Sequence, residues 1–123
     1  MSPSVRLRAA GAVAAVGAAA ALAAAPAFAH APIKTLTPKS GATASTSLRY
    51  VRASFKEGIV SAALSVKRGS TTVSTGSPAF NERRTALRER LRSGLTAGRY
   101  AAHLRWVSDD GHVQTKTWSF RLR

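Results

Sequence analysis

The chain has 123 residues, of which 19 are Lys or Arg and 5 are Asp or Glu, giving a formal net charge of +14. This length predicts a single domain, and the 45% hydrophobic and 20% charged content argues against wholesale disorder. The absence of cysteine excludes disulfide scaffolds, thiolate metal sites, iron–sulfur clusters, cysteine nucleophiles and lipid-modified cysteine anchors.

Residues 1–29 have the pattern of a secretory signal peptide. Arg6 and Arg8 make the start positive, and an uncharged run rich in Ala, Val, Gly and Leu follows. Ala27 and Ala29 then supply the small side chains that signal peptidase reads. A retained membrane anchor is the alternative, since about 17–20 apolar residues span a bilayer. Ala and Gly insert weakly, however, and the run leads straight into the cleavage pattern.

Cleavage after residue 29 gives a mature domain of residues 30–123, and the lack of an Arg-Arg pair within residues 1–29 favours the Sec pathway over the twin-arginine pathway. Two of the 19 basic residues leave with the signal, so 17 basic and 5 acidic residues remain and the net charge is +12. The mature domain contains no second apolar run of spanning length. We therefore expect an exported, periplasmic protein that does not span the membrane and that begins at His30.

Hydrophobic alternation in the mature domain is typical of β-strands. Val51, Ala53 and Phe55 fall on one face of a strand, with charged or polar residues between them. The same alternation recurs in residues 64–66, 100–106 and 118–122, and Gly, Pro, Ser and Asp residues separate these segments. The pattern predicts an all-β domain, an antiparallel sandwich of about seven strands.

The segment Asn81–Leu91 fits two patterns. Arg83, Leu87 and Leu91 have helical spacing, whereas Leu87, Glu89 and Leu91 alternate as in a strand. Periodicity does not decide between the two in so short a run. The surrounding sheet pattern favours a strand.

His30 acquires unusual chemistry when it becomes the first residue. Its free α-amine and its imidazole belong to one residue, so together they can chelate one metal ion through two nitrogens. Copper(II) prefers tetragonal nitrogen and oxygen ligands, and imidazole suits it. A chance His at the cleavage site is the alternative. In the uncleaved chain this nitrogen is an amide, and the chelate cannot form.

A second candidate metal motif lies in residues 108–112, Ser-Asp-Asp-Gly-His. Asp110 and His112 are two residues apart and project to the same side of an extended segment. Gly111 between them allows a close backbone approach or a positive φ. The alternative interpretation is an ordinary polar turn between two Trp-bearing strands.

Two further polar residues have simpler interpretations. His103 lies mid-strand on the same face as Arg105, and we expect it to be an ordinary solvent-facing residue. Glu57 follows Phe55 at the end of a strand, where a turn carboxylate or a partner for one of the many arginines is the ordinary role.

Several motifs resemble the CopC family of periplasmic copper-binding proteins, in order and at matching spacing across the mature chain. The most specific is the ending, from Leu-Thr-Ala-Gly-Arg-Tyr at 95–100 to Trp-Val-Ser-Asp-Asp-Gly-His at 106–112. The other motifs are His-Ala-Pro at 30–32, Thr-Pro-Lys-Ser-Gly-Ala at 37–42, Ala-Ser-Phe-Lys-Glu at 53–57 and Trp-Ser-Phe at 118–120. Residues 64–91 match only as generic strands.

The resemblance implies a Greek-key, immunoglobulin-like β-sandwich or barrel that binds one Cu(II) ion per chain. In that family pattern His30 donates its amine and imidazole and His112 donates a second imidazole, an arrangement called a histidine brace. Asp110 would be a further oxygen ligand or would orient the site and balance its charge. Glu57, where some relatives carry a nearby carboxylate, is a fourth and weaker candidate. The implied role is copper tolerance, homeostasis or delivery, with a CopD-type inner-membrane copper transporter as partner.

The sequence also departs from the family pattern. Relatives that hold Cu(I) use a cluster of Met residues, whereas the only Met here is Met1, which leaves with the signal. We therefore expect no Met-type Cu(I) site. Gly58 and Val113 stand where proline is common in the family, and neither change removes a ligand.

The high positive charge bears on metal binding. A positive protein repels cations, so a metal site here needs local carboxylates, and Asp109 and Asp110 flank the proposed ligand His112. Imidazole and amine nitrogens must be deprotonated to coordinate, so we expect binding to weaken as the pH falls.

Two other classes of function remain open from the residues alone. An exported basic β-sandwich could bind polyanions or the anionic envelope surface, with Arg83, Arg84, Arg88, Arg90 and Arg92 in one stretch. Nucleic acid is not an expected partner, because no aromatic-plus-basic stacking motif appears. Copper oxygenases also use a histidine brace, but they are larger and present a broad substrate face, so we expect no enzymatic activity.

Overall fold

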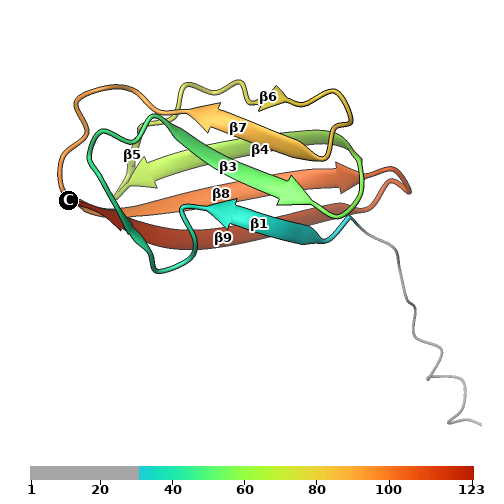
Figure 1. Ribbon diagram of the computed structural model, residues 1–123, viewed down its shortest axis with the longest axis horizontal. Helices are drawn as coiled ribbons and strands as arrows, with labels where there is room; N and C mark the ends of the chain where they lie inside the picture. The colour runs from blue at the N-terminus through green and yellow to red at the C-terminus, as the bar shows by residue number, and fades with distance from the viewer. Residues whose placement is uncertain (1–30) are drawn as a thin grey trace, which may run out of the picture.

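The computed structural model describes residues 31–123, which form two packed β-sheets with no helix between those limits (Figure 1). The predicted signal peptide and His30 lie outside the described residues. One sheet has the strand order β1-β3-β7-β6 and the other has the order β2-β9-β8-β4-β5. The strands are β1 (Ile33–Thr37), β2 (Thr43–Ala44), β3 (Tyr50–Phe55), β4 (Ile59–Arg68), β5 (Thr71–Thr72), β6 (Ala79–Phe80), β7 (Ala86–Arg90), β8 (Gly98–Ser108) and β9 (Val113–Leu122).

The predicted all-β sandwich is confirmed, with two differences in detail. The described residues contain nine strands rather than about seven, because β2, β5 and β6 are two-residue strands too short to give an alternation signal. The pairing is not wholly antiparallel, since Thr43 and Ala44 of β2 run parallel to Arg121 and Leu122 at the end of β9. The remaining strand pairs are antiparallel.

The core lies between the two sheets and is built from the alternating positions that the sequence predicts. Val51, Ala53 and Phe55 of β3 are buried, and so are the alternate residues 100, 102, 104 and 106 of β8. Phe55 packs against Trp106 across the core, with ring centroids 5.4 Å apart. Each sheet therefore presents one apolar face inward and one polar face to solvent, as period-two alternation dictates.

The ambiguous segment 81–91 contains a strand and no helix. Residues 86–90 form β7, which pairs with β3. The Asn81 side chain organises the turn before it, because Asn81 Oδ1 accepts hydrogen bonds from the backbone amides of Thr85 (2.8 Å) and Ala86 (3.0 Å). The strand interpretation is confirmed, and the helical spacing of the leucines was coincidental.

Glu89 is a charged residue on the buried face of β7. Its side chain is fully buried, and its Oε2 accepts hydrogen bonds from the Gly76 amide at 2.6 Å and from Thr75 Oγ1 at 3.2 Å. Its Oε1 has no hydrogen-bond partner. Glu89 therefore links the β5–β6 loop to β7. Because it is buried, it contributes no carboxylate to the protein surface.

The turns divide between the two ends of the sandwich (Figure 1). The start of β1 and the β3–β4, β6–β7 and β8–β9 turns lie at one end, which we call the Ala31 end. The β1–β2, β4–β5 and β7–β8 loops and the end of β9 lie at the other, which we call the Arg123 end. Residues far apart in the sequence therefore meet at each end.

Tyr100 fixes the β7–β8 connection at the Arg123 end. Its ring is buried and stacks on Phe120 at 6.0 Å, and its hydroxyl donates a 2.6 Å hydrogen bond to the Thr96 carbonyl oxygen, four residues upstream. Immunoglobulin-like sandwiches use a tyrosine in the same way to fix a connection between sheets.

We predict that Tyr100→Phe lowers the free energy of unfolding by about 1 kcal/mol, because it removes only this hydrogen bond. For a domain of this size the melting temperature should fall by about 4–8 °C, measured by thermal denaturation of the mature protein. Tyr50→Phe is the matched control, since among residues 31–123 the Tyr50 ring contacts Arg52 and Arg88 and its hydroxyl makes no hydrogen bond. Equal losses in the two variants would contradict a role for the Tyr100 hydroxyl.

Candidate metal centre

The β8–β9 hairpin carries the predicted Asp110–His112 motif in a tight turn at the Ala31 end. The turn closes through a 3.1 Å hydrogen bond from the Ser108 amide to the His112 carbonyl and a 2.9 Å bond from the Gly111 amide to the Ser108 carbonyl. Gly111 has a φ of 87°, a conformation that L side chains rarely adopt, so glycine is required here. The predicted polar turn is therefore present, and it organises the motif.

Asp110 and His112 contact each other directly. Asp110 Oδ2 lies 3.0 Å from His112 Nδ1, and Asp110 Oδ1 accepts a 3.1 Å hydrogen bond from the His112 amide. The Ser108 hydroxyl also donates a hydrogen bond to Asp110 Oδ1. Metal-binding histidines commonly engage a carboxylate through one ring nitrogen while the other coordinates, because the carboxylate fixes the orientation of the ring.

The same hydrogen bonds set the charge of this carboxylate. The Ser108 hydroxyl and, to a lesser degree, the His112 amide donate to Asp110, and they hold the pKa of its carboxyl well below the ordinary range. Asp110 therefore keeps its negative charge to lower pH than an ordinary aspartate does. It supplies a fixed negative charge beside the His112 imidazole.

The first described residues are fastened to the same end of the sandwich. Trp106 Nε1, on β8, donates a 2.9 Å hydrogen bond to the carbonyl oxygen of Ala31, which is buried. The Lys56 amide donates a second 2.9 Å bond to the Pro32 carbonyl. Trp106 lies two residues before Ser108, so the start of the domain is held beside the strand that leads into the Asp110–His112 turn.

The other predicted residues stand apart from this pair. Within residues 31–123, no group of three or more His, Asp or Glu side chains gathers into a metal-binding cluster, so Glu57 does not join Asp110 and His112. Glu57 is exposed in the β3–β4 turn at the same end. His103 is an exposed residue of β8 whose Nδ1 lies 3.1 Å from Thr117 Oγ1, and it takes no part in the motif.

Sequence reasoning missed how the carboxylates are distributed. Four of the five acidic residues lie in turns at the Ala31 end, namely Glu57, Glu82, Asp109 and Asp110. The fifth, Glu89, is buried. The Arg84 guanidinium joins the β6–β7 turn to the start of β4 by donating hydrogen bonds to the carbonyls of Ile59 (3.1 Å) and Val60 (2.8 Å). The turns lie far apart in the sequence, and only the order of the strands brings them together.

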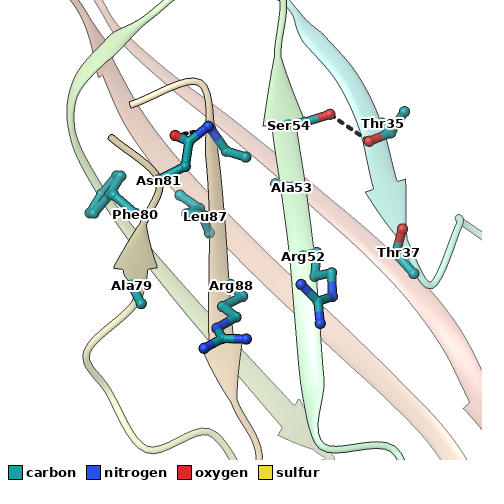
Figure 2. A pocket seen from close by; sticks show the side chains of 11 residues that line it. Thr35, Thr37, Arg52, Ala53, Ser54, Ala79, Phe80, Asn81, Leu87 and Arg88 are labelled. Carbon is teal, nitrogen blue, oxygen red and sulfur yellow. Dashed lines mark hydrogen bonds between the residues drawn. The ribbon is translucent and has the colours of Figure 1, made fainter. Parts of the chain in front are cut away.

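A hollow on the surface belongs to another part of the molecule. It has a volume of about 400 Å³ and lies on the outer face of the sheet formed by β1, β3, β7 and β6 (Figure 2). Arg52 and Arg88 line it from neighbouring strands, as Figure 2 shows, and neither Asp110 nor His112 contributes to it.

The family follows from a comparison of the whole sequence with protein-family models. Residues 33–123 match the model of the CopC domain. The chain belongs to the CopC family. No curated protein matches the sequence. In the part of the chain that the structure covers, no helix is long and apolar enough to cross a membrane.

Solved structures of CopC proteins share the fold. The crystal structure of CopC from Methylosinus trichosporium OB3b matches with a TM-score of 0.68 and 18% identity, covering 76% of this chain and 93% of that one. PcoC from Escherichia coli, described as a methionine-rich copper resistance protein, matches with a TM-score of 0.63 and 22% identity, covering 77% of this chain and 100% of that one. The predicted immunoglobulin-like CopC fold is thereby confirmed.

We predict that Ser108→Ala raises the pKa of Asp110 toward its ordinary value, because the Ser108 hydroxyl is the strongest donor to the ionised form. In the unchanged protein the depressed pKa means that Asp110 keeps its negative charge to lower pH than an ordinary aspartate does. Carbon-13 NMR of the Asp110 carboxyl in the metal-free protein measures its pKa in the unchanged protein and in the Ser108→Ala variant. Ser45→Ala, at a distant Ser–Ser contact, is the control, and an unchanged titration in Ser108→Ala would contradict the assignment.

Proposed function

We propose that the mature domain, residues 30–123, binds one Cu(II) ion at the Ala31 end and serves copper tolerance, homeostasis or delivery in the periplasm. The observation that carries the proposal is the hydrogen bond from Trp106 to the Ala31 carbonyl. This bond holds Ala31 beside β8, the strand that leads into the turn with Asp110 and His112, and we propose that His30, the preceding residue in the sequence, joins them after signal cleavage. Membership of the CopC family supports the same conclusion.

Signal cleavage would turn His30 into a chelating residue. Its new α-amine and its imidazole would donate two nitrogens, and the His112 imidazole would donate a third. These are the nitrogen ligands that Cu(II) favours in tetragonal surroundings. Because the α-amine exists only after cleavage, the uncleaved chain would lack the complete site, and copper would be bound only after export.

Asp110 would hold the His112 ring and balance the charge of the ion. The contact between Asp110 Oδ2 and His112 Nδ1 supports an orienting role, and the depressed pKa of Asp110 supports a charge-balancing role. Glu57 remains a fourth candidate, at the same end but outside the pair.

The presence of four carboxylates at the Ala31 end supports cation binding in a strongly basic protein. Glu57, Glu82, Asp109 and Asp110 lie at the end that would receive the ion. The mature chain carries a net charge of +12, and its overall field repels Cu(II). Local negative charge reduces this repulsion where the ion enters.

The residue inventory favours Cu(II) over Cu(I). The only methionine is Met1, within the predicted signal peptide, so the mature domain has no thioether ligand. PcoC of Escherichia coli, by contrast, is described as methionine-rich. Soft thioether ligands select Cu(I), whereas imidazole and amine ligands suit Cu(II). We propose a binding role without catalysis, with a CopD-type membrane transporter as the partner that family resemblance implies.

The first test compares the two histidines of the described domain. His112→Ala should weaken Cu(II) binding by about tenfold or more, because the substitution removes a ligand. His103→Ala is the matched control, since His103 is exposed on the same strand as Trp106 and lies outside the motif. Isothermal titration of the processed protein with Cu(II) measures both. Equal affinities in the two variants, or no stoichiometric binding by the unchanged protein, would contradict the proposal.

A second test separates the anchoring of the N-terminus from general stability. Trp106 and Trp118 are both buried, and each donates a 2.9 Å indole hydrogen bond to a backbone carbonyl, of Ala31 and Pro38 respectively. Trp106→Phe and Trp118→Phe should each lower the free energy of unfolding by about 1–3 kcal/mol. Only Trp106→Phe should also lower copper affinity, by about tenfold. Equal copper affinities would show that the anchor does not serve the site.

A further inference from the structure

Positive charge is concentrated at the Arg123 end of the sandwich. Seven exposed arginines lie there at strand ends and loops, namely Arg49, Arg68, Arg90, Arg92, Arg99, Arg121 and Arg123. No exposed acidic side chain among residues 31–123 shares that end, so its positive charge is not offset there. At the Ala31 end the four carboxylates are matched by Lys34, Lys56, Arg83 and Arg84. The long axis of the protein therefore has one near-neutral end and one strongly basic end.

Two hollows open at the Arg123 end, and each is lined by a pair of these arginines. Arg99 and Arg121 line one of about 380 Å³, together with Ser40 and Gly41. Arg68 and Arg92 line another of about 140 Å³. Guanidinium groups bind phosphate oxygens through two parallel hydrogen bonds, so a pair of them in a hollow suits a phosphate group.

Arg99 and Arg121 have unfavourable neighbours in the protein itself. They lie directly opposite each other on β8 and β9. Like charges directly opposite in a sheet are destabilising, and neither arginine forms an ion pair with a carboxylate of residues 31–123. A bound anion would offset this repulsion.

The exposed side chains at the Arg123 end favour an anionic lipid surface over an anionic protein as the partner. Protein interfaces depend on buried apolar or aromatic anchors surrounded by polar groups. The exposed large hydrophobic residues of the described domain are Val60 and Val113, and both lie at the Ala31 end. The Arg123 end thus offers charge and hydrogen-bond donors without an apolar anchor, which suits an anionic lipid surface better than a protein.

We propose that the Arg123 end docks on membranes that contain anionic phospholipids, with lipid phosphates in the two arginine-lined hollows. The 11-residue β8 strand runs the length of the sandwich, so docking would hold the Ala31 end about 35 Å from the lipid. If the proposed copper site is correct, docking turns it away from the membrane. The docking itself does not depend on copper.

The test is sedimentation of the processed, metal-free protein with vesicles. Binding is expected to vesicles of phosphatidylcholine mixed with phosphatidylglycerol, and not to pure phosphatidylcholine vesicles. Each exposed basic residue near the surface contributes about fivefold to partitioning, so R99Q/R121Q/R123Q should bind about 100-fold more weakly. Circular dichroism checks that this triple variant is folded.

Two matched variants test whether the location of the charge matters. K34Q/K56Q/R83Q removes three positive charges at the Ala31 end, and R52Q/R88Q removes two from the hollow of Figure 2. Both should change vesicle binding by less than about threefold, because their charges lie away from the lipid. Losses as large as that of R99Q/R121Q/R123Q would show that net charge alone drives adsorption and would overturn the proposal. Binding to soluble polyphosphate with no binding to vesicles would overturn it in favour of a polyanion ligand.

The orientation can be measured because the chain has no cysteine of its own. Ser70, in the β4–β5 hairpin, and Ser61, near the start of β4, are both exposed and lie toward opposite ends. A fluorophore attached through S70C should be quenched by a quencher carried on the lipid, whereas the same fluorophore attached through S61C should not. Equal quenching at the two positions would overturn the proposed orientation.

Discussion

The hydrogen bond from Trp106 Nε1 to the Ala31 carbonyl is the constraint on which the account of this protein depends. It spans 75 residues of sequence and links the first described residues to the strand that leads into the Asp110–His112 turn. Ala31 and the Trp106 ring are buried, so the link is protected from water. Without it, the segment before Ile33 would be held mainly by the Pro32–Lys56 bond, on the other sheet. A site shared between the N-terminus and the β8–β9 turn requires this fastening.

Electrostatics give the two ends of the sandwich different chemistry. At the Ala31 end, Ser108 and the His112 amide keep Asp110 ionised, and four carboxylates offset the field of a protein with far more basic than acidic residues. At the Arg123 end no exposed acidic side chain of residues 31–123 offsets the positive charge of the arginines. The burial of Glu89 sharpens the difference, because it removes the fifth carboxylate from the surface. One end is thus suited to a cation and the other to anions, at opposite ends of the same strands.

The sequence predicts features that depend on local pattern and misses those that depend on strand order. Alternation identifies the buried faces of β3, β8 and β9, since side-chain period is a local property. The Asp110–His112 contact is equally local, because the residues are two apart on a glycine turn. Three features join segments that are distant in sequence. They are the parallel β2–β9 pair, the position of Glu57 and Glu82 at the same end as Asp110, and the Trp106–Ala31 hydrogen bond. Alternation also placed Glu89 on the inward face, but its partners Thr75 and Gly76 come from another loop.

The claim that the processed N-terminus completes the copper site is tested most directly by electron paramagnetic resonance of the Cu(II)-loaded protein. Two forms are compared, one that begins at His30 and one that keeps Ala29 ahead of it, so that the nitrogen of His30 is an amide. The account predicts one tightly bound Cu(II) with a nitrogen-rich tetragonal spectrum in the first form, and a changed spectrum with weaker binding in the second. Identical spectra and affinities in the two forms would contradict it.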